Sequence, residues 1–471
     1  MRHGSRARLS IALALLIASV GCAPGADRFP SSAATTPAPT SAAAVPTQAK
    51  PAAAPANPDA AAPKPASSAA AGRPSGEISY WAFGDAEELA IFEAVVEGYR
   101  RHNADVTVKL NIVPNQNEFM TKLSASFTAG AGPDVFLINY RRYGQYAEKN
   151  VLEPLEGRLA ASSSLRKDQF FEIPLKAFTW NGTLQCIPQN QSSLVVYYNR
   201  DVFEKYGVAL PRESWRWRDF LDTARALTKD TDGDGGIDLH GLAAEPTIIR
   251  AAPFIWQRGG RLVDDEEKPT RITMDDPKTK EALRFFVDLG ATHRVSPNEA
   301  EYKAEGPDSR FMRGKAAMTL NSRRAVPELR TIKGFTWDVA APPSDAESAT
   351  TLHSDAYCLS AASGNKAAAW EFIEYAIGLE GQQITARLGR TVPSLKDVAT
   401  SPAFLDPGQA PANSKLFLEL APKLKLLPIL AEWPAIERFM NEEIEAAFFG
   451  TRSFDEAIET ANRKSNEQLK R

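Results

Sequence analysis

The chain has 471 residues, of which 43% are hydrophobic, and it carries a formal net charge of −3 at pH 7. That length is enough for more than one hydrophobic core. A slightly acidic chain lacks the basic surface that nucleic acids select, so we expect no nucleic-acid partner.

The N-terminal residues predict an export signal that ends in a lipid attachment site. Three arginines precede an apolar run, residues 9–20, which is too short to span a bilayer comfortably. The run ends in Ser-Val-Gly-Cys, which resembles the bacterial lipobox although serine replaces the usual leucine. We therefore predict a lipoprotein signal peptide over residues 1–21 and acylation of Cys22, with ordinary cleavage nearby as the alternative.

Residues 22–76 consist almost wholly of Ala, Pro, Ser and Thr. A segment with so few large apolar side chains cannot bury enough surface to offset the entropy of ordering, so we predict disorder. The prolines favour a semi-extended tether, which would hold a folded body away from the membrane to which Cys22 is attached. No other segment of the sequence is long and apolar enough to cross a bilayer.

The folded part begins with alternating strand and helix patterns. Residues 78–83 predict a strand, and Asp85 with Glu88 three places later predicts a helix N-cap and its capping box. Alternation over residues 106–112 predicts a second strand, and residues 133–138 predict a third, buried one. Apolar residues at helical spacing fill both gaps. This order predicts a parallel sheet with helices on both faces and ligand-binding loops at the carboxyl ends of its strands.

The remainder of the chain mixes further strands and amphipathic helices. A strand is predicted over residues 193–198. Helices are predicted over residues 217–227, 282–289, 368–377 and 432–449. Together with the first sheet, these elements indicate two α/β lobes, each with its own core.

Several blocks, in this order, resemble the family of extracellular solute-binding proteins that serve sugar importers, the maltose-binding protein group. The run Ala-Gly-Ala-Gly-Pro-Asp-Val-Phe at 129–136 resembles the family's third strand. Val-Tyr-Tyr-Asn-Arg-Asp-Val-Phe at 196–203 resembles its first hinge strand and the helix after it. Phe-Met-Arg-Gly-Lys-Ala-Ala-Met at 311–318 is similar to another family block, and residues 359–366 resemble the second hinge.

The resemblance implies an α/β chain with the type II, periplasmic-binding-protein-like fold: two lobes, a hinge of three crossings and a ligand cleft between the lobes. Lobe one would comprise residues 77–189 and 361–420, and lobe two residues 190–360 and 421–471. The crossings are expected near residues 188–192, 359–361 and 415–425. Closure of the hinge would bury a mono- or oligosaccharide and present the closed form to the permease subunits of an ABC importer. We expect a monomer.

A sugar site combines flat aromatic rings with planar amide, carboxylate or guanidinium groups, because sugars present apolar ring faces and many hydroxyls. Such residues occur where the resemblance implies the cleft. The predicted ligand-binding residues are Trp81, Phe83, Gln116, Asn139, Tyr140, Arg142, Gln189, Asn190, Gln191, Trp256, Asn321, Arg324, Asp355 and Trp433. The alternative for the tryptophans is a place in the core, and for residues 189–191 it is a cap on the hinge.

Arginines stand where the family commonly has a tryptophan that stacks on the sugar. After the block at 311–318, the residues are Ser322, Arg323 and Arg324. With Arg141 and Arg142, these arginines would converge on the cleft from both lobes. Arginine forks suit carboxylates and phosphates, which predicts an acidic or phosphorylated sugar; a shifted loop with exposed arginines is the alternative.

Besides Cys22, the chain has two cysteines, Cys186 and Cys358. In the family, the strands around these two positions run side by side through the hinge. The resemblance therefore leaves two alternatives. One is a disulfide between them, which requires a suitable approach of the Cβ atoms, and the other is a pair of small buried hydrophobic side chains.

Residues 230–238, Asp-Thr-Asp-Gly-Asp-Gly-Gly-Ile-Asp, match the first nine places of an EF-hand calcium loop. The oxygen ligands would be Asp230, Asp232, Asp234 and Asp238. Place 12 is a glycine instead of the usual bidentate glutamate, and a distant acid such as Glu245 could replace it. We predict a structural calcium of weak affinity, with an ordinary Asp-Gly turn as the alternative, and no required cofactor.

A secreted glycan hydrolase is the alternative among enzymes. Such enzymes need two carboxylates that flank a cleft, and no acid in this sequence stands in a motif that marks such a pair. The sequence also lacks Gly-x-Ser-x-Gly, His-Glu-x-x-His and Walker motifs. We therefore expect a binding protein and not an enzyme. A binding module that feeds a sensor would use the same cleft, so that alternative stays open.

Overall fold

The computed structural model describes residues 72–470, which belong to one compact unit. The predicted signal peptide, Cys22 and most of the predicted tether lie outside these residues. The folded body begins slightly before the predicted boundary, because the Nδ2 of Asn365 donates to the carbonyl of Ser75 at 2.9 Å. We find no helix within the described part of the chain whose length and hydropathy suit a membrane span.

One sheet contains six strands, in the order β2-β1-β3-β13-β4, with β7 paired to β13. Its strands are β1 (Gly76–Phe83), β2 (Val106–Val113), β3 (Val135–Asn139), β4 (Leu152–Glu153), β7 (Ile187–Pro188) and β13 (Asp355–Ser360). β1 lies parallel to β2 and to β3, as predicted, whereas β13 runs antiparallel to β3. Because β3 is buried along its whole length, its side chains are almost all apolar.

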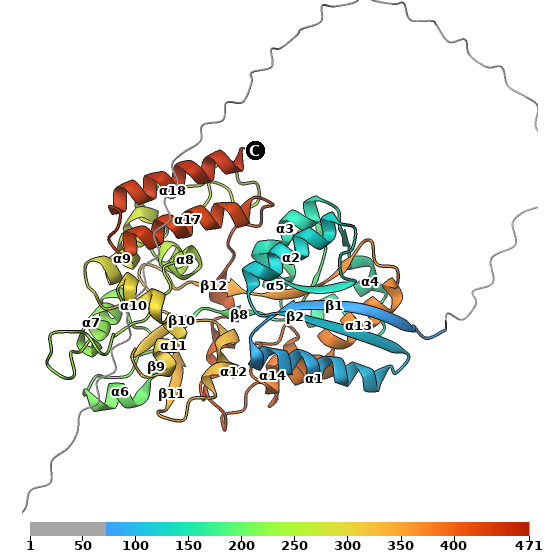
Figure 1. Cartoon of the computed structure of the whole chain (residues 1–471), viewed down its shortest axis with the longest axis horizontal. Coiled ribbons are helices and arrows are strands. Elements are labelled where there is room, and N and C mark those ends of the chain that lie inside the picture. The colour runs from blue at the N-terminus through green and yellow to red at the C-terminus, as the bar shows by residue number, and fades with distance from the viewer. Residues whose placement is uncertain (1–71, 471) are drawn as a thin grey trace, which may run out of the picture. The chain divides into compact units, whose positions relative to one another are not determined.

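Helices pack around this large sheet, and α1 begins where the sequence predicts (Figure 1). The backbone N–H of Glu88 donates to Asp85 Oδ1 at 2.9 Å, and the N–H of Asp85 donates to Glu88 Oε2 at 3.2 Å, which completes the capping box. The helices of this part are α1 (Ala86–His102), α2 (Gln116–Thr128), α3 (Tyr140–Glu148), α4 (Glu156–Ala161), α5 (Glu172–Ala177), α13 (Lys366–Ile377), α14 (Leu379–Arg387), α15 (Lys396–Ala399) and α16 (Leu416–Glu419). A short hairpin joins β5 (Thr179–Trp180) to β6 (Thr183–Leu184).

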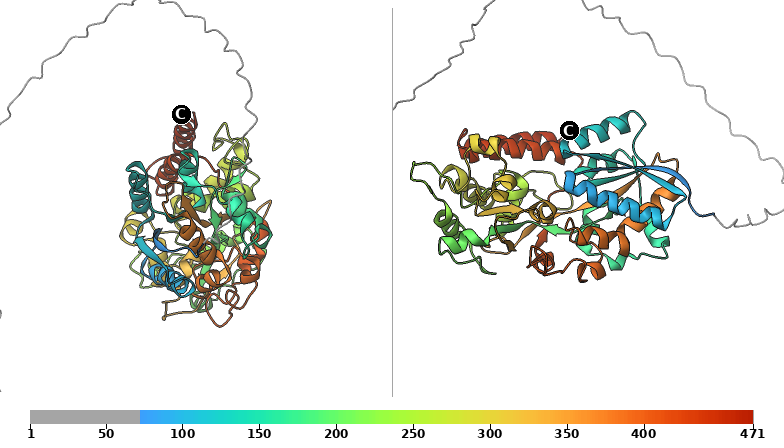
Figure 2. Two further views of the ribbon diagram at one scale, coloured as in Figure 1. Left: turned by 90° about the vertical axis from the view of Figure 1, so that its right-hand side faces the viewer. Right: turned by 60° about the horizontal axis from the view of Figure 1, so that its bottom comes forward.

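A second group of elements surrounds a smaller, antiparallel sheet. β9 (Val195–Asn199) lies between β10 (Met318–Asn321) and β11 (Trp337–Ala340). The helices of this group are α6 (Arg200–Lys205), α7 (Trp217–Leu227), α8 (Ile248–Gln257), α9 (Pro277–Ala291), α10 (Glu299–Ala304), α11 (Pro307–Met312), α12 (Val326–Leu329), α17 (Trp433–Phe448) and α18 (Phe454–Leu469). α17 packs against α9 and α18 and also touches α3 of the first group. The right-hand view of Figure 2 shows the two groups as separate bodies.

Three short strands join the two groups: β8 (Ser192–Ser193), β12 (Thr350–His353) and β14 (Leu424–Lys425). Figure 1 shows β8 and β12 between the groups. The second crossing falls earlier than the predicted residues 359–361. β13 pairs with β3 from Asp355 onward, so residues 355–360, which were predicted to belong to lobe two, belong to the large sheet.

The two cysteines of the folded body, Cys186 and Cys358, form a disulfide, with their Cα atoms 4.5 Å apart. Of the two alternatives, the structure therefore selects the bridge. The bond joins the residue before β7 to the middle of β13, beside the segments that connect the two groups. Both residues are fully buried.

Candidate ligand-binding site

A polar cavity of about 290 Å³ lies between the two groups of elements, and we call it the central cavity. Among the residues that the sequence suggested for the cleft, the following line this cavity: Phe83, Gln116, Asn139, Arg141, Arg142, Asn190, Asn321, Arg324 and Asp355. Residues outside the predicted set also line it: Asn117, Ser192, Glu245, Thr247, Ile249, Arg250, Ser322, His353, Glu437 and Asn441. Strand ends, a hinge segment and a C-terminal helix thus converge on one space, as the resemblance implied.

One wall of the central cavity is built at the carboxyl ends of the parallel strands. Phe83 ends β1, Gln116 opens α2 after β2, and Asn139 ends β3. Asn139 is fixed by three hydrogen bonds. Its Oδ1 accepts from the backbone N–H of Arg141 at 3.2 Å and from Arg141 Nε at 3.1 Å, and its Nδ2 donates to Asp355 Oδ1 at 3.0 Å. A cap residue in this position holds its side chain at the start of the helix, so the local fold places an amide at the cavity wall.

Glu437 of α17 extends from the second group to two arginines of α3. The Nη1 of Arg141 donates to Glu437 Oε1, and the Nη1 of Arg142 lies 3.4 Å from Oε2. Glu437 is only 2% exposed, so its charge is largely removed from water. Burial lowers the pKa of Arg142, although the carboxylate of Glu437 opposes that shift. Breaking one side of such a pair would leave a buried charge without a partner.

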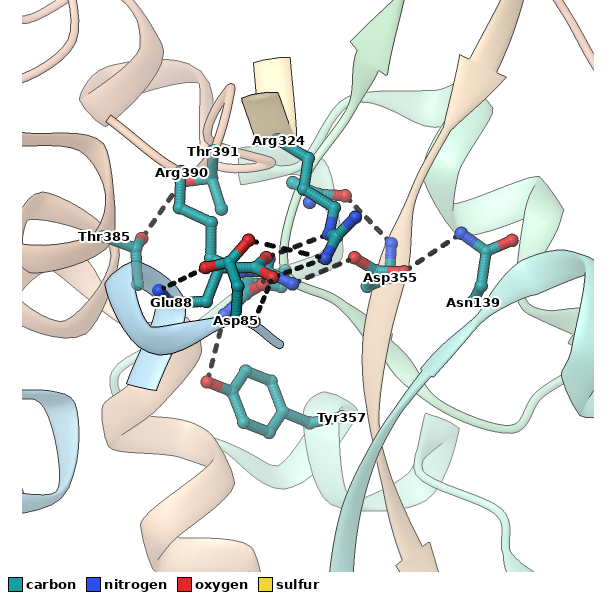
Figure 3. Close-up of polar contacts among 11 residues, drawn as sticks. Asp85, Glu88, Asn139, Arg324, Asp355, Tyr357, Thr385, Arg390 and Thr391 are labelled. Atoms are coloured by element: carbon teal, nitrogen blue, oxygen red, sulfur yellow. Dashed lines mark hydrogen bonds and ion pairs between the residues drawn. The ribbon is translucent and has the colours of Figure 1, made fainter. Parts of the chain in front are cut away.

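A second set of ion pairs connects Arg324 of the smaller group to Glu88 of α1. Arg324 donates from Nε to Glu88 Oε1 at 3.0 Å and from Nη2 to Oε2 at 2.6 Å, and the Nε of Arg390 lies 2.9 Å from Oε1 (Figure 3). Burial raises the pKa of Glu88, but the charges of Arg390 and Arg324 outweigh that effect and hold it below its ordinary value. The capping-box residue therefore also joins the two groups.

Arg390 organises the polar residues behind the central cavity. Its Nη2 lies 3.4 Å from Asp355 Oδ2, and its Nη1 donates to Gln189 Oε1 at 2.8 Å. The Nε2 of Gln189 donates to the hydroxyl of Tyr357 at 3.1 Å. Gln189 is fully buried and does not line the central cavity, which corrects its predicted place at the cleft. Both the oxygen and the nitrogen of the Gln189 amide thus form hydrogen bonds with neighbouring side chains.

The two other hinge amides differ from each other. Asn190 lines the central cavity, and its Oδ1 accepts from the backbone N–H of Asp355 at 2.9 Å. Gln191 is 2% exposed and lies outside the cavity lining, so its predicted position is also corrected. Adjacent residues of an extended segment point to opposite sides, which explains why only one amide of the three reaches the cavity.

Arg250 is the principal cation on the wall contributed by the smaller group. Its Nη2 lies 3.1 Å from Glu245 Oε2 and donates to Asn321 Oδ1 at 3.2 Å. Asn321 in turn donates to Asp308 at 2.8 Å, and burial raises the pKa of Asp308 above its ordinary value. Glu245 therefore lines the central cavity, and it is not among the acids that cluster in the aspartate-rich loop.

Three aromatic residues that were expected at the cleft do not line the central cavity. Trp81 is partly buried and packs against the hydrophobic core from β1. Tyr140 is fully buried, and its hydroxyl accepts from the backbone N–H of Leu427 at 3.1 Å. Trp433 is fully buried at the start of α17. Complete burial of a large ring contributes more than partial contact with a polar cavity, so packing determines the positions of Tyr140 and Trp433.

Trp256 lines a different hollow. This groove has a volume of about 730 Å³, and its lining includes Trp180 of β5 and residues 426–430, which precede α17. We call it the tryptophan groove. Trp256 is 7% exposed on α8 and does not line the central cavity, so its predicted place at the cleft is corrected.

Arg323 does not converge on the cleft with the other arginines. It is fully buried; its Nε donates to the carbonyl of Gly389 at 3.0 Å and its Nη1 donates to Ser414 Oγ at 2.9 Å. Its guanidinium also lies over the ring of Phe404. Burial lowers the pKa of Arg323 to about 9. The prediction of four converging arginines is therefore wrong for Arg323, while its neighbour Arg324 lines the cavity.

Two lining residues that the prediction missed had signals in the sequence. Arg250 interrupts α8, an otherwise apolar helix with the sequence Ile-Ile-Arg-Ala-Ala-Pro-Phe-Ile-Trp-Gln, and a charge in such a run usually has a specific partner. Glu437 stands one helical turn after Trp433, on the same face of α17. The prediction therefore chose the correct face of α17, but Glu437 lines the cavity and Trp433 does not.

The aspartate-rich loop is exposed and lies apart from the central cavity lining. Asp230, Asp232 and Asp238 can each place one carboxylate oxygen within 4.8 Å of the others. Backbone N–H groups of Gly233 and Gly235 donate to Asp230 and lower its pKa. The side chain of Asp234 accepts from the N–H of Gly236 at 2.6 Å. These bonds also describe an ordinary turn, so the calcium site stays a prediction.

Two bodies that are connected by three strands, with a polar cavity between them, define a two-lobed binding protein. The family comparison agrees. The family model described as bacterial extracellular solute-binding protein matches residues 84–383, and the chain belongs to this family. Members of this family are exported proteins that bind solutes.

Relatives and solved structures support the same fold. A binding protein of Brucella abortus is 23% identical over 387 residues, covering 81% of this chain and 90% of the relative. The Listeria monocytogenes ABC substrate-binding protein in complex with cycloalternan has a TM-score of 0.78 and 24% identity, covering 84% of this chain and 99% of that one. A Thermotoga lettingae ABC transporter solute-binding protein bound to α-D-tagatose has a TM-score of 0.73 and 22% identity, covering 84% and 100%.

Proposed function

We propose that this chain captures a carbohydrate outside the cytoplasm and delivers it to the permease subunits of an ABC importer. The observation that carries the proposal is the central cavity, a polar space between the two groups of a chain that belongs to the solute-binding family. The Listeria and Thermotoga proteins were each solved with a sugar bound, and the Pyrococcus abyssi relative is a maltotriose-binding protein.

The cavity lining has the chemistry that a sugar needs. Amides such as Asn139 and Asn190 both donate and accept, and the guanidinium of Arg250 supplies donors in a planar fork. Carboxylates such as Asp355 accept from hydroxyls, and Phe83 offers an apolar ring. A sugar ring with several hydroxyl groups could therefore form hydrogen bonds with lining residues on more than one side of the cavity.

We further propose that the two groups act as lobes that close over the ligand about β8, β12 and β14. In this proposal the lobes have the predicted boundaries, except that residues 355–360 move to lobe one. The ion pairs of Glu437 with α3 and of Arg324 with Glu88 would then bridge the lobes on closure. Because each ion pair joins residues of opposite lobes, closure would depend on charged side chains from both lobes.

Attachment to the membrane completes the proposal. A signal peptide over residues 1–21 would direct export, and an acyl chain on Cys22 would hold the protein at the extracytoplasmic face. The Ala- and Pro-rich segment would act as the spacer, and the folded body would work as a monomer. In a Cys22→Ser variant, we expect the protein to leave the membrane fraction and appear in the soluble exported fraction. Equal membrane retention of both forms would refute the lipid anchor.

Ligand capture is tested by mass spectrometry of small molecules that co-purify with the protein, followed by isothermal titration with the sugars identified. We expect one-to-one binding and an unchanged sugar after prolonged incubation with stoichiometric protein. Steady release of a cleaved product would instead support a glycan-active enzyme. Absence of any carbohydrate in both experiments would overturn the proposed function.

A further inference from the structure

Carboxylates of the protein offset most of the positive charge that lines the central cavity, although Arg141 and Arg142 share a single carboxylate. Arg141 and Arg142 pair with Glu437, with the Nη1 of Arg142 3.4 Å from its Oε2. Arg250 pairs with Glu245 at 3.1 Å. A ligand that carried a carboxylate or phosphate would meet these carboxylates next to the guanidinium groups that it would bind.

The remaining charges around the cavity are balanced in the same way. Arg324 forms a two-bond contact with Glu88 and lies 3.9 Å from Asp85. The buried Arg390 behind the cavity contacts both Glu88 and Asp355. Figure 3 shows these groups in one continuous network. An added anion would face the carboxylates of Asp355 and Glu437, which line the same cavity as the arginines, and like charges repel each other.

Buried polar atoms on the cavity-lining side chains lack a hydrogen-bond partner among the described residues. They include donors, namely the Nε of Arg142 and the Nε and Nη1 of Arg250. They also include Thr247 Oγ1, which can donate or accept, His353 Nε2, and the carboxylate oxygen Oε2 of Glu437, which can only accept. A buried polar atom without a partner costs about 1–3 kcal/mol, so a ligand that satisfies these atoms gains affinity. A hydroxyl group both donates and accepts, whereas a carboxylate only accepts.

The size and surface of the cavity limit the ligand further. Its volume of about 290 Å³ lies at the lower end of the range of about 300–1,000 Å³ for small-molecule sites. Phe83 supplies a phenyl ring to the lining, and within residues 72–470 no tyrosine or tryptophan lines this cavity. One ring offers a stacking face to one sugar unit, not to a row of them.

We propose that the central cavity selects a compact, electrically neutral sugar of one or two rings, held mainly by hydrogen bonds, and that Glu437 and Glu245 disfavour acidic sugars by offsetting most of the charge of Arg141, Arg142 and Arg250. The inference rests on the proposed function and deepens it. It reverses the expectation of an acidic or phosphorylated ligand that the arginines raise in the sequence.

The test is an isothermal titration panel of neutral mono-, di- and trisaccharides, in which each binding monosaccharide is then compared with its own uronate and 6-phosphate. For the wild-type protein, we expect the neutral sugar to bind at least about tenfold more tightly than its charged forms. Tighter binding of a uronate or phosphate would overturn the inference. Binding confined to trisaccharides would overturn its statement on size. Failure of every sugar in the panel, neutral or charged, would instead overturn the proposed function.

Charge-neutral variants test the cause of the selectivity. Glu437→Gln frees the arginines of α3, so the ratio of neutral to uronate affinity should fall by roughly tenfold or more. Glu245→Gln should shift the ratio in the same direction through Arg250, which keeps the test independent of whether the first variant folds. Glu442→Gln is the matched control, because Glu442 is exposed on α17 and pairs with Arg438. An unchanged ratio in both test variants would refute the role of the carboxylates.

Discussion

The molecule has two hollows of different character, the central cavity and the tryptophan groove. The groove is the larger, about 730 Å³ against about 290 Å³, and it contains the indole rings of Trp180 and Trp256. The central cavity has one phenyl ring but many charged and amide groups. Among the described residues of the groove lining, we find no buried side-chain atom without a hydrogen-bond partner, whereas the central cavity has several. Unsatisfied polar groups, and not volume or tryptophan content, therefore identify the candidate binding site.

The largest expected effect comes from removing a residue of the central cavity. Arg250→Ala should weaken sugar binding by about a hundredfold, equivalent to about 2.7 kcal/mol, because several of its donors have no other partner. Trp256→Ala removes the main ring of the groove and should leave the affinity within about twofold, although the loss of a buried indole lowers the melting temperature. Isothermal titration and a thermal melt of both variants separate the two effects. The opposite pattern of affinities would place the ligand in the groove.

The next prediction concerns a histidine that lines the central cavity, whereas no histidine is among the groove-lining residues of the described chain. Burial, followed by the charges of Arg250, Arg141 and Arg324, holds the pKa of His353 well below its ordinary value. A neutral histidine of this kind contributes stability above the unfolded-state pKa of about 6.5, and that contribution is lost as the pH falls. When the pH falls from 7 to 5, the loss of this contribution should lower the free energy of unfolding by about 1–2 kcal/mol.

Denaturant unfolding of the wild type and of His353→Asn at both pH values measures this contribution. On acidification from pH 7 to pH 5, the free energy of unfolding should fall less for the variant than for the wild type, by the same amount of about 1–2 kcal/mol. His240, whose pKa burial lowers to about 4, contributes to the acid sensitivity of both proteins and so cancels in the difference. Equal pH dependence of the two proteins would show that His353 does not remain neutral in the folded state.

Closure over the central cavity should depend on Arg324. The Arg324→Ala variant leaves Glu88 with Arg390 as its remaining cation, so we expect it to fold, but one bridge between the two groups is lost. Because the Arg324 side chain is 47% exposed, we expect a moderate effect of about five- to tenfold on affinity. Small-angle scattering should show a larger radius of gyration without sugar than the wild type has. Scattering and affinity that match the wild type would refute the bridge.

Local patterns predicted much of the fold because they depend on neighbouring residues. The alternation in β2 and the capping box of Asp85 and Glu88 are confirmed, since a strand face or a helix start depends on spacing alone. The side chains of the cavity were harder to predict. Trp433 and Glu437 share one face of α17, and only the packing of the distant helix α3 determines which of them reaches the cavity. A choice of site residues by their aromatic rings alone therefore included residues, such as Trp433, that are buried in the core.

The smallest expected effect concerns the exposed loop at 230–238, which lines neither hollow. If its aspartates bind calcium weakly, the melting temperature should rise by about 1–2 °C with millimolar calcium relative to chelator. The double variant Asp232→Ala, Asp234→Ala should lose that rise. No shift in the wild type, or the same shift in the variant, would mean that the loop is only a turn. Sugar affinity should be unchanged in either case.

The central claim is that the polar cavity, and not the larger groove, holds a sugar. A crystal structure of the protein with the tightest-binding neutral sugar tests this claim most directly. We expect one bound sugar in contact with Phe83, Asn190 and Arg250, with hydroxyls within hydrogen-bond distance of the free donors of Arg250. Sugar density against Trp180 and Trp256, with none in the central cavity, would contradict the account.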